Sequence, residues 1–317
     1  MKKLSLYLTL NLLFITFVTI TGCSDSNDSD NSDSNDTDSV CTPKMPTGTG
    51  KNGDHCLEME DCASGFCTTS SHAPADKDAI CAKAPAVGDI HLLSTLTDFM
   101  TGDIIPNQTL KVGGGFDVSQ NPTGFPVAAE ITSDKNGKID ELLTGKTTKL
   151  PLAIVVVGEA KDYYPTSTGV STPEAGCGIY PPATRNADLK MIKKADLTAL
   201  SDALKNSYPD ESDNLPLGDK GGVLGVIKFV ETGAGVKDTV VKSTIDTSKT
   251  RIYYLNKAQD GFTKDKTSEN GIFILIKAGL AEEFVAYKNN KIISRRPATA
   301  GETSGVLFTT TIQVDKQ

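Results

Sequence analysis

The chain has 317 residues, with 32 Lys and Arg against 40 Asp and Glu, and a formal net charge of −8. A nucleic-acid-binding protein needs a basic surface to neutralise phosphates, so this balance argues against nucleic acid as a partner. There is no Trp, and only 6% of the residues are aromatic, which disfavours large stacking platforms for bases or sugar rings. Neither property excludes an enzyme.

The first residues have the order of a secretory signal. Lys2 and Lys3 form a positive start, residues 4–20 are uncharged and mostly apolar, and a small-residue site ends at Cys23. A membrane-spanning helix needs about 20 predominantly apolar residues. This stretch is shorter and is interrupted by Ser, Thr and Asn. We therefore assign residues 1–22 as a signal peptide.

The cleavage site Ile20-Thr21-Gly22-Cys23 resembles the lipobox of bacterial lipoproteins. The resemblance implies that Cys23 is lipidated and becomes the first mature residue, so that the membrane is a partner through the lipid anchor. Stable anchoring takes more than one acyl chain, and the family's diacylglycerol and N-acyl groups satisfy this requirement. In enteric-type bacteria an Asp directly after the Cys retains the protein in the inner membrane. Ser24 at that place favours the outer membrane or cell surface.

Residues 23–40 form a polar tether. After Cys23 the segment to Ser39 contains only Ser, Asp, Asn and one Thr, which cannot offset the entropy of ordering, so we expect disorder. Alternating Asp residues also suggest calcium binding. A calcium loop, however, needs a turn-forming Gly and a bidentate carboxylate at fixed offsets, and neither is present. The pattern favours a spacer.

Six cysteines remain for disulfide bonds once Cys23 carries the lipid. An even number of cysteines in an exported chain is typical of a disulfide set. Zinc binding is the alternative, but the cysteine spacings are too wide for paired Cys-x-x-Cys knuckles. Six cysteines allow 15 pairings, which stay open. The candidates are Cys41, Cys56, Cys62, Cys67, Cys81 and Cys177.

Residues 41–84 form a cysteine-rich module. The run from Asp61 to Cys67, with Cys56 before it and Cys81 after it, resembles a short motif of extracellular cysteine-rich modules. So small a segment cannot bury enough apolar surface to fold alone, and cross-links replace a core. Because the module holds five cysteines, we predict that Cys177 pairs with one of them.

A glycine-rich stretch in this module, residues 48–53, matches the dinucleotide-binding spacing Gly-x-Gly-x-x-Gly. That fingerprint works between a buried strand and a helix N-terminus. Neither is expected here, so the stretch predicts a flexible loop and no cofactor.

From residue 85 onward, short alternating apolar runs are separated by Gly, Asn, Asp and Pro, which is typical of sandwich-type β architecture. We predict a mainly β fold with two Ig-like or transthyretin-like β-sandwich domains, preceded by the disulfide-rich module and the disordered tether. The predicted strands are 90–96, 109–112, 127–131, 152–157, 223–229, 236–243, 252–255, 272–276, 284–288 and 306–314.

The two predicted domains, residues 85–183 and 218–317, carry similar turns. Each has a Thr-Gly turn, at Thr101 or Thr232, and a later Asn-Gly turn, at Asn136 or Asn270. Asn-Gly between apolar runs favours a tight hairpin in which both residues have positive φ. This order resembles the carboxypeptidase-regulatory-like β-sandwich, which implies non-catalytic binding or spacer units.

Residues 184–217 are predicted to be a short helical connector. Leu197, Leu200 and Leu204 recur at helical spacing, and Asp196 can cap the first turn. A partner-binding amphipathic helix is one interpretation. The other, which the pattern favours, is a connector that packs its Leu stripe on a sandwich.

No residue pattern identifies a reaction. The three His are scattered, there is no Gly-x-Ser-x-Gly, and the Asp134–Glu141 run lacks the carboxylate ligands of a calcium loop. We therefore predict no catalytic residue, metal or cofactor. The expected function is a lipid-anchored, non-catalytic binding, adhesion or structural module that contacts an envelope protein or glycan. The alternative is an envelope polysaccharide hydrolase or its accessory, which needs only two facing carboxylates.

Overall fold

The computed structural model describes residues 48–56, 61–64, 66–68, 80–83, 89–145, 150, 153–171, 180, 183–244, 250–295 and 297–315. The signal peptide, the tether, Cys23, Cys41 and Cys177 lie outside the described residues, so the expectations for them stay predictions. By its internal contacts the chain divides into residues 1–40 and residues 41–317, so both predicted sandwich domains fall in one unit.

The described chain is mainly β, with sandwich-like sheets, as the sequence predicts. The first half contains two facing layers of strands. One layer is the sheet β10-β3-β7, and the other contains β9, β8, β5 and β6. Their bounds are β3 (Ile90–Thr95), β4 (Thr97–Asp98), β5 (Thr109–Gly114), β6 (Ala129–Thr132), β7 (Lys138–Leu143), β8 (Ile154–Ala160), β9 (Tyr163–Ser171), β10 (Ala183–Ala187) and β11 (Lys190–Met191), with the short helix α1 (Gly115–Gln120) after β5.

The second half repeats this plan. The strands β15, β14, β16, β12 and β20 form one layer, and β13, β17, β18 and β19 form the other. Their bounds are β12 (Val223–Phe229), β13 (Val240–Ser243), β14 (Arg251–Leu255), β15 (Phe262–Thr263), β16 (Ile272–Ile276), β17 (Glu282–Lys288), β18 (Lys291–Ile292), β19 (Ala298–Ala300) and β20 (Leu307–Val314). The predicted strands 223–229 and 272–276 are confirmed residue for residue.

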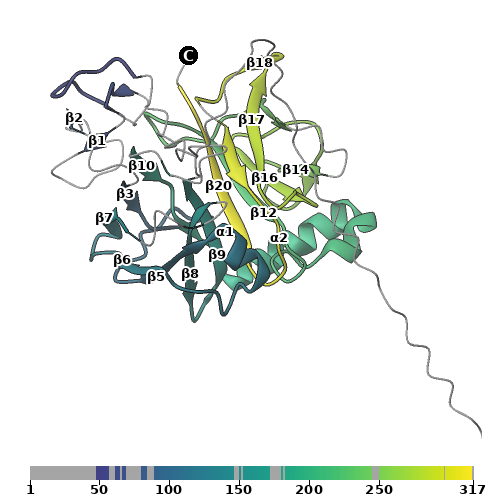
Figure 1. Ribbon diagram of the computed structural model, residues 1–317. Coiled ribbons are helices and arrows are strands. Elements are labelled where there is room, and N and C mark those ends of the chain that lie inside the picture. Colours follow the sequence, from purple (N-terminus) through teal and green to yellow (C-terminus); the bar gives the residue numbers. More distant parts are fainter. Residues whose placement is uncertain are drawn as a thin grey trace, which may run out of the picture. The chain divides into compact units, whose positions relative to one another are not determined.

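One sheet crosses both halves, which the sequence does not predict. The C-terminal strand β20 pairs in parallel with β12 on one side and with β9 on the other. Figure 1 shows β20, in yellow, between these two strands. The result is a nine-stranded sheet in the order β15-β14-β16-β12-β20-β9-β8-β5-β6. We call the junction of β9 and β20 the seam.

Successive side chains along the strands of this sheet point alternately into two separate hydrophobic cores. In β20, Phe308 and Ile312 face one core, which is shared with β13 and β17. Leu307 points to the opposite face, where α2 and its connecting segments pack. Because successive side chains in a strand point to opposite faces, one strand serves both layers.

The predicted helix is α2 (Lys194–Ser207), followed by the 3-10 helix η3 (Pro209–Asn214). Leu197, Leu200 and Leu204 are buried against the second half, so the connector interpretation is confirmed. The N-cap is Lys193, without a side-chain cap bond, and Asp196 lies in the first turn instead. The prediction that Asp196 caps the helix is therefore wrong. No helix in the described part of the chain is long and apolar enough to cross a lipid bilayer.

The internal repeat is confirmed by hydrogen bonds that recur in both halves. In each half one buried residue makes two backbone hydrogen bonds. Its N–H donates to the carbonyl of the Asn-Gly glycine, and its carbonyl accepts the N–H of the residue nine positions later. The equivalent bonds are Leu96 N to Gly137 O (2.8 Å) and Ile227 N to Gly271 O (2.9 Å), then Ile105 N to Leu96 O (3.0 Å) and Val236 N to Ile227 O (2.9 Å).

The Asn-Gly turns are not hairpins, which corrects the sequence expectation. Only the glycine of each pair, Gly137 or Gly271, has positive φ. The first turn leads from β6 to β7, which belong to different sheets, and the second leads from β15 to β16, which are separated by β14. In the first turn the Asp134 carboxylate accepts the backbone N–H groups of Asn136 (2.7 Å) and Lys138 (2.8 Å). These bonds stabilise the turn without a partner strand.

Candidate functional site

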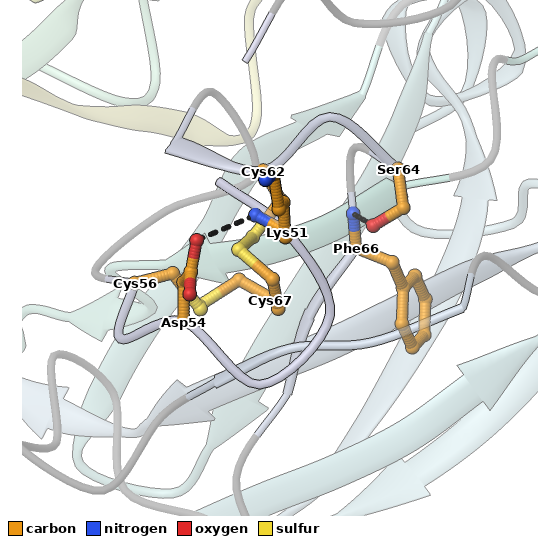
Figure 2. Close-up of a disulfide and its surroundings, with 8 residues drawn as sticks. Lys51, Asp54, Cys56, Cys62, Ser64, Phe66 and Cys67 are labelled. Carbon is orange, nitrogen blue, oxygen red and sulfur yellow. Dashed lines mark hydrogen bonds between the residues drawn. A yellow bond between two sulfur atoms is a disulfide. The ribbon is translucent and has the colours of Figure 1, made fainter. Parts of the chain in front are cut away.

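Two disulfides hold the cysteine-rich module together. Cys56 bonds to Cys67 and Cys62 to Cys81, with Cα–Cα distances of 5.9 and 5.4 Å. All four half-cystines are buried against one another and form the core of the module. Short side-chain contacts brace the surrounding loops, among them Lys51 N to Asp54 Oδ2 at 2.7 Å and Phe66 N to Ser64 Oγ at 3.3 Å (Figure 2).

A zinc site is not what brings these sulfurs together. The ligand atoms of Cys56, Cys62 and Cys67 lie within 4.8 Å of one another, which is metal-ligand proximity. Zinc binds thiolates, however, and each of these sulfurs is bonded to another sulfur. The grouping is a consequence of the two crossed disulfides.

The glycine-rich stretch packs on the disulfides, so the expectation of a flexible loop is wrong. A Cβ on Gly48 would lie 2.4 Å from the Cys62 carbonyl oxygen, and one on Gly50 would lie 2.8 Å from the Cys81 sulfur. Gly50 also exchanges backbone hydrogen bonds with Asp61 and Ala63, each at 2.8 Å. The glycines permit close backbone approach, a structural role that does not involve a cofactor.

One described histidine joins the module to the body. The His91 ring on β3 stacks on Phe66 with ring centroids 5.4 Å apart, and its Nε2 bonds to the Asp140 carboxylate on β7. His55 lies in the module, in a bridge with Ile80. These two histidines thus have different neighbours, and His72 lies outside the described residues.

The strongest candidate site is at the seam, where the sheet forks. β9 and β20 pair only from Leu307 to Thr309, opposite Thr166 to Thr168. Beyond this point β9 continues to Ser171 beside β8, and β20 continues to Val314 beside β12. The Thr168 and Thr309 hydroxyls, 2.5 Å apart, close the base of the fork.

A cavity of about 300 Å³ lies in this fork; we call it the seam cavity. Side chains from both faces of β20 line it, with Thr310 on one face and Thr311 and Gln313 on the other. The arms of β9 contribute Gly169 and Ser171, while β10 and the residue after it contribute Arg185, Asn186 and Asp188. Side chains from both faces of one strand can line the same cavity only if that cavity lies in the plane of the sheet.

The mouth of the seam cavity is marked by exposed residues. Glu283 on β17 and Pro297 before β19 line the cavity and are exposed, whereas Thr310 and Ser171 are buried. The cavity therefore runs from a solvent-accessible rim to a polar interior between the two halves. Ligand sites often lie at such interfaces between domains.

Asp188 lines the cavity, and two lysines balance the negative charge of its carboxylate. It accepts the Thr311 hydroxyl at 2.7 Å and the Lys228 ammonium at 2.8 Å, and Lys190 lies 3.6 Å away. Burial by itself raises the pKa of Asp188, but the two ammonium groups and these hydrogen bonds outweigh it and hold the pKa below the usual value of 3.8. Asp188 is therefore ionised and ion-paired.

Sequence reasoning does not predict the seam cavity. Among the cysteines that it singles out, the four described ones lie in the module, and none of these four lines the cavity. No strand is predicted at β9 or β10, which supply part of the cavity lining, whereas the lining residues of β20 lie in a predicted strand. One signal in the sequence is the polar run Thr166-Ser167-Thr168, which contains two β-branched threonines. Its alternation is weak as a strand signal because both faces are polar.

Comparison with known proteins gives weak structural similarity alone. No family model matches the chain, and no curated protein matches it. The Bacillus anthracis TIE protein is 12% identical at a TM-score of 0.20, over 72% of this chain and 34% of that one. The shaft pilin SpaA from Lactobacillus rhamnosus GG is 10% identical at a TM-score of 0.21, over 73% of this chain and 99% of that one. A Streptococcal ancillary pilin is 11% identical at a TM-score of 0.22, over 75% of this chain and 66% of that one.

The chain thus spans about a third of the length of the TIE protein. At TM-scores near 0.2 these similarities assign no function, so the functional argument depends on the residues of this chain.

Proposed function

We propose that this protein is a lipid-anchored, non-catalytic binding module of the cell envelope, and that its ligand enters the seam cavity. The observation that carries the proposal is a polar cavity at the junction of two sandwich-like halves, with a solvent-exposed rim. The two disulfides support export, because such bonds persist in oxidising compartments. The lipobox on Cys23 and the polar tether supply the anchor and the spacer.

The hydrolase alternative is less well supported. Asp188 and Glu283 are the carboxylates among the described residues that line the cavity. A glycosidase needs one carboxylic acid with a raised pKa to protonate the leaving group. The pKa of Asp188 is lowered instead, and its oxygen is occupied by Thr311 and two lysines. This arrangement favours binding over hydrolysis.

The binding role can be tested by site-specific cross-linking in native cells. A photo-reactive residue in place of Glu283, at the rim, is expected to capture an envelope component. The same residue in place of Lys135, in an exposed turn of the first half, serves as control. A product specific to position 283 supports the proposal. The absence of a product there, or the same products from both positions, contradicts it.

The anchor is tested separately. Growth with an alkyne-bearing fatty acid is expected to label the wild-type protein and not the Cys23→Ser variant, because the Cys23 thiol carries the lipid. Protease treatment of intact cells then distinguishes exposure on the cell surface from an inward-facing location. Equal labelling of wild type and Cys23→Ser would exclude Cys23 as the lipid carrier.

A further inference from the structure

A β-bulge in β9 shapes the wall of the seam cavity that faces β20. In the pairing of β8 with β9, Val155 lies opposite Gly169. The residue before it, Ile154, lies opposite Ser171, so β9 has one extra residue at this place, Val170. A bulge bends its strand and changes the direction of the side chains beside it, and bulges are common next to active sites. All three of these β9 residues line the cavity. The bulge therefore accounts for the divergence of β9 from β20 and for the position of Ser171 at the cavity.

Two polar atoms of the cavity wall have no partner in the described chain. They are the Ser171 hydroxyl, on the β9 arm of the fork, and the Gln313 amide oxygen, on the β20 arm, and both atoms are buried. Ser171 is only 6% exposed. Leaving a buried polar atom without a hydrogen bond costs free energy, because the bond to water is lost and nothing replaces it. An amide oxygen only accepts, whereas a hydroxyl donates and accepts. A ligand with hydroxyl groups at both arms would satisfy both atoms.

The charged residues of the cavity favour a neutral ligand. Asp188 accepts hydrogen bonds from Lys228 and Thr311, so its charge is already compensated. Arg185 also interacts with another group of the protein. The remaining charged residue of the described lining, Glu283, is at the exposed rim. A charged ligand would lose its hydration in the interior and find its counter-charges already engaged, which is unfavourable.

The size and lining of the cavity limit the ligand further. A volume of about 300 Å³ is at the lower end for ligand pockets and suits a single ring. None of the described residues that line it is aromatic, so recognition depends on hydrogen bonds with no ring stacking. The hydroxyls of Thr168 and Thr309 close the base, and Glu283 and Pro297 mark the mouth. A chain of rings can therefore place only its last ring inside.

We propose that the seam cavity binds a neutral pyranose ring, the terminal residue of a glycan. Ring hydroxyls bond to the Ser171 hydroxyl and donate to the Gln313 amide oxygen, and the linkage to the rest of the glycan leaves through the mouth. The inference rests on the proposed binding function and specifies the ligand class of the same site. Because Ser171 belongs to the first half and Gln313 to the second, the ring bonds to both halves at once.

The test is calorimetric titration of the full mature protein in detergent. The methyl glycosides of glucose, galactose and mannose are the probes, and the corresponding hexuronate and hexosamine glycosides are controls with the same rings and one charge. We expect at least one neutral glycoside to bind, at least tenfold more tightly than its charged counterparts. No binding of any neutral glycoside at millimolar concentration would overturn the proposal, as would equal or tighter binding of a charged counterpart.

The free sugars test the terminal placement. The anomeric oxygen faces the mouth when the rest of the glycan leaves through it, so methylation of that oxygen should not weaken binding. Equal affinity for a free sugar and its methyl glycoside supports a glycan terminus as the ligand. Binding of the free sugar with loss of binding on methylation would overturn that placement.

A matched pair of serine variants assigns the hydrogen bonds. Ser171→Ala and Gln313→Leu are each expected to weaken glycoside binding at least fivefold, because a ligand hydroxyl is then left unpaired. Ser167→Ala is the control: Ser167 lies on the same strand, is 0% exposed and has a hydroxyl without a partner in the described chain, but it does not line the cavity. It should leave affinity unchanged.

Thermal unfolding separates binding from folding in these variants. Since neither serine hydroxyl has a partner in the unliganded protein, neither Ala variant should lower the unfolding temperature. If Gln313→Leu fails to fold, the comparison of Ser171→Ala with Ser167→Ala decides. Unchanged affinity in folded Ser171→Ala, or equal weakening by Ser167→Ala, would overturn the assignment.

This experiment separates the two proposals. If no sugar binds but the cross-linker at position 283 still captures an envelope component, the ligand class is wrong and the binding function stands. If position 283 also captures nothing, the binding function fails too.

Discussion

At the scale of single residues, buried carboxylates form ion pairs and hydrogen bonds that connect different strands of the described chain. Asp188 lies between β10 and β11 and contacts β12 through Lys228, β20 through Thr311 and β11 through Lys190. Glu211 has a similar role on the other side of α2: Arg251, at 2.6 Å, and Tyr253 donate to it, as does Asn214 at 2.7 Å. Each buried carboxylate is surrounded by donors, so its charge is compensated.

Asp188→Asn is expected to destabilise the protein by about 3 kcal/mol, because it leaves the Lys190 and Lys228 ammonium groups together without their counter-ion. Chemical denaturation at neutral pH measures this difference. Asp202→Asn, at an exposed position of α2, is the control and should change stability by less than about 0.5 kcal/mol. A loss no larger than that of the control would mean that the ionic cluster contributes nothing.

We expect the stability difference between the wild type and Asp188→Asn to depend on pH. The pKa of Asp188 is lower in the folded protein than its usual value of 3.8. Its contribution is therefore fully present above pH 3.8 and is lost as the pH falls through the lower folded pKa. Below pH 3.8 the wild type should lose stability more steeply than Asp188→Asn. Parallel stability curves in this range would contradict the lowered pKa.

Two glycines with the same backbone conformation test whether the repeated turn has room for a side chain. Gly271 and Gly233 have the same φ of +68°, but a Cβ on Gly271 would lie 2.2 Å from the Ile227 carbonyl oxygen, whereas a Cβ on Gly233 meets nothing within 4 Å. Gly233→Ala should cost about 1–2 kcal/mol from its conformation alone. Gly271→Ala should cost at least about 2 kcal/mol more from the clash. Equal unfolding free energies would show that the repeated turn tolerates the side chain.

At the scale of elements, β20 is the strand on which both halves depend. It pairs with β12 over seven residues and with β9 over three, and the β9 contact ends with the hydroxyl pair of Thr168 and Thr309. Both threonines are buried. β20 is therefore the central strand of the shared sheet, and the point where it leaves β9 forms the cavity.

A double-mutant cycle at this pair tests the seam. Thr309→Val leaves the Thr168 hydroxyl buried without its partner and should cost about 1–3 kcal/mol, whereas changing both threonines to Val should be close to neutral. Denaturation of the two single variants and the double variant gives the coupling energy. Additive losses would show that the hydroxyl pair does not stabilise the junction.

At the scale of the whole molecule, four of the six candidate cysteines pair within the module. Cys56–Cys67 and Cys62–Cys81 leave Cys41 and Cys177 from the original set. The sequence prediction that Cys177 pairs with a module cysteine therefore narrows to Cys41. Such a bond would tie the first half of the body to the module.

Non-reducing peptide mapping by mass spectrometry tests this pairing. The expected result is a peptide that joins Cys41 to Cys177, and thiol labelling of the Cys177→Ser variant should expose one new thiol, that of Cys41. Free thiols on both cysteines in the wild type, or bonding of Cys177 to another chain, would contradict the prediction.

The elements that the sequence predicts well are those with strong local patterns. The strands β12 and β16, the Leu stripe of α2 and the repeated turns all follow from apolar periodicity or from glycine at fixed places. β9 has no such pattern, because it contains Pro165 and Gly169 and is polar on both faces. Its strand conformation depends on pairing with β8, which directly precedes it, and with β20, which is distant in sequence. The only local signal that we identify for the seam cavity is therefore the weak polar run from Thr166 to Thr168.

The sequence by itself predicts an export signal and determines the cysteine set, the β class and the repeated turns, since each depends on residues that are close along the chain. The tertiary structure alone decides that one sheet joins the halves, that four cysteines cross-link the module, and that a polar cavity opens where β9 and β20 diverge. β9 and β20 pair although more than a hundred residues separate them along the chain. Such pairing depends on how the faces and edges of the sheets fit together in space. No local pattern of side chains specifies that fit.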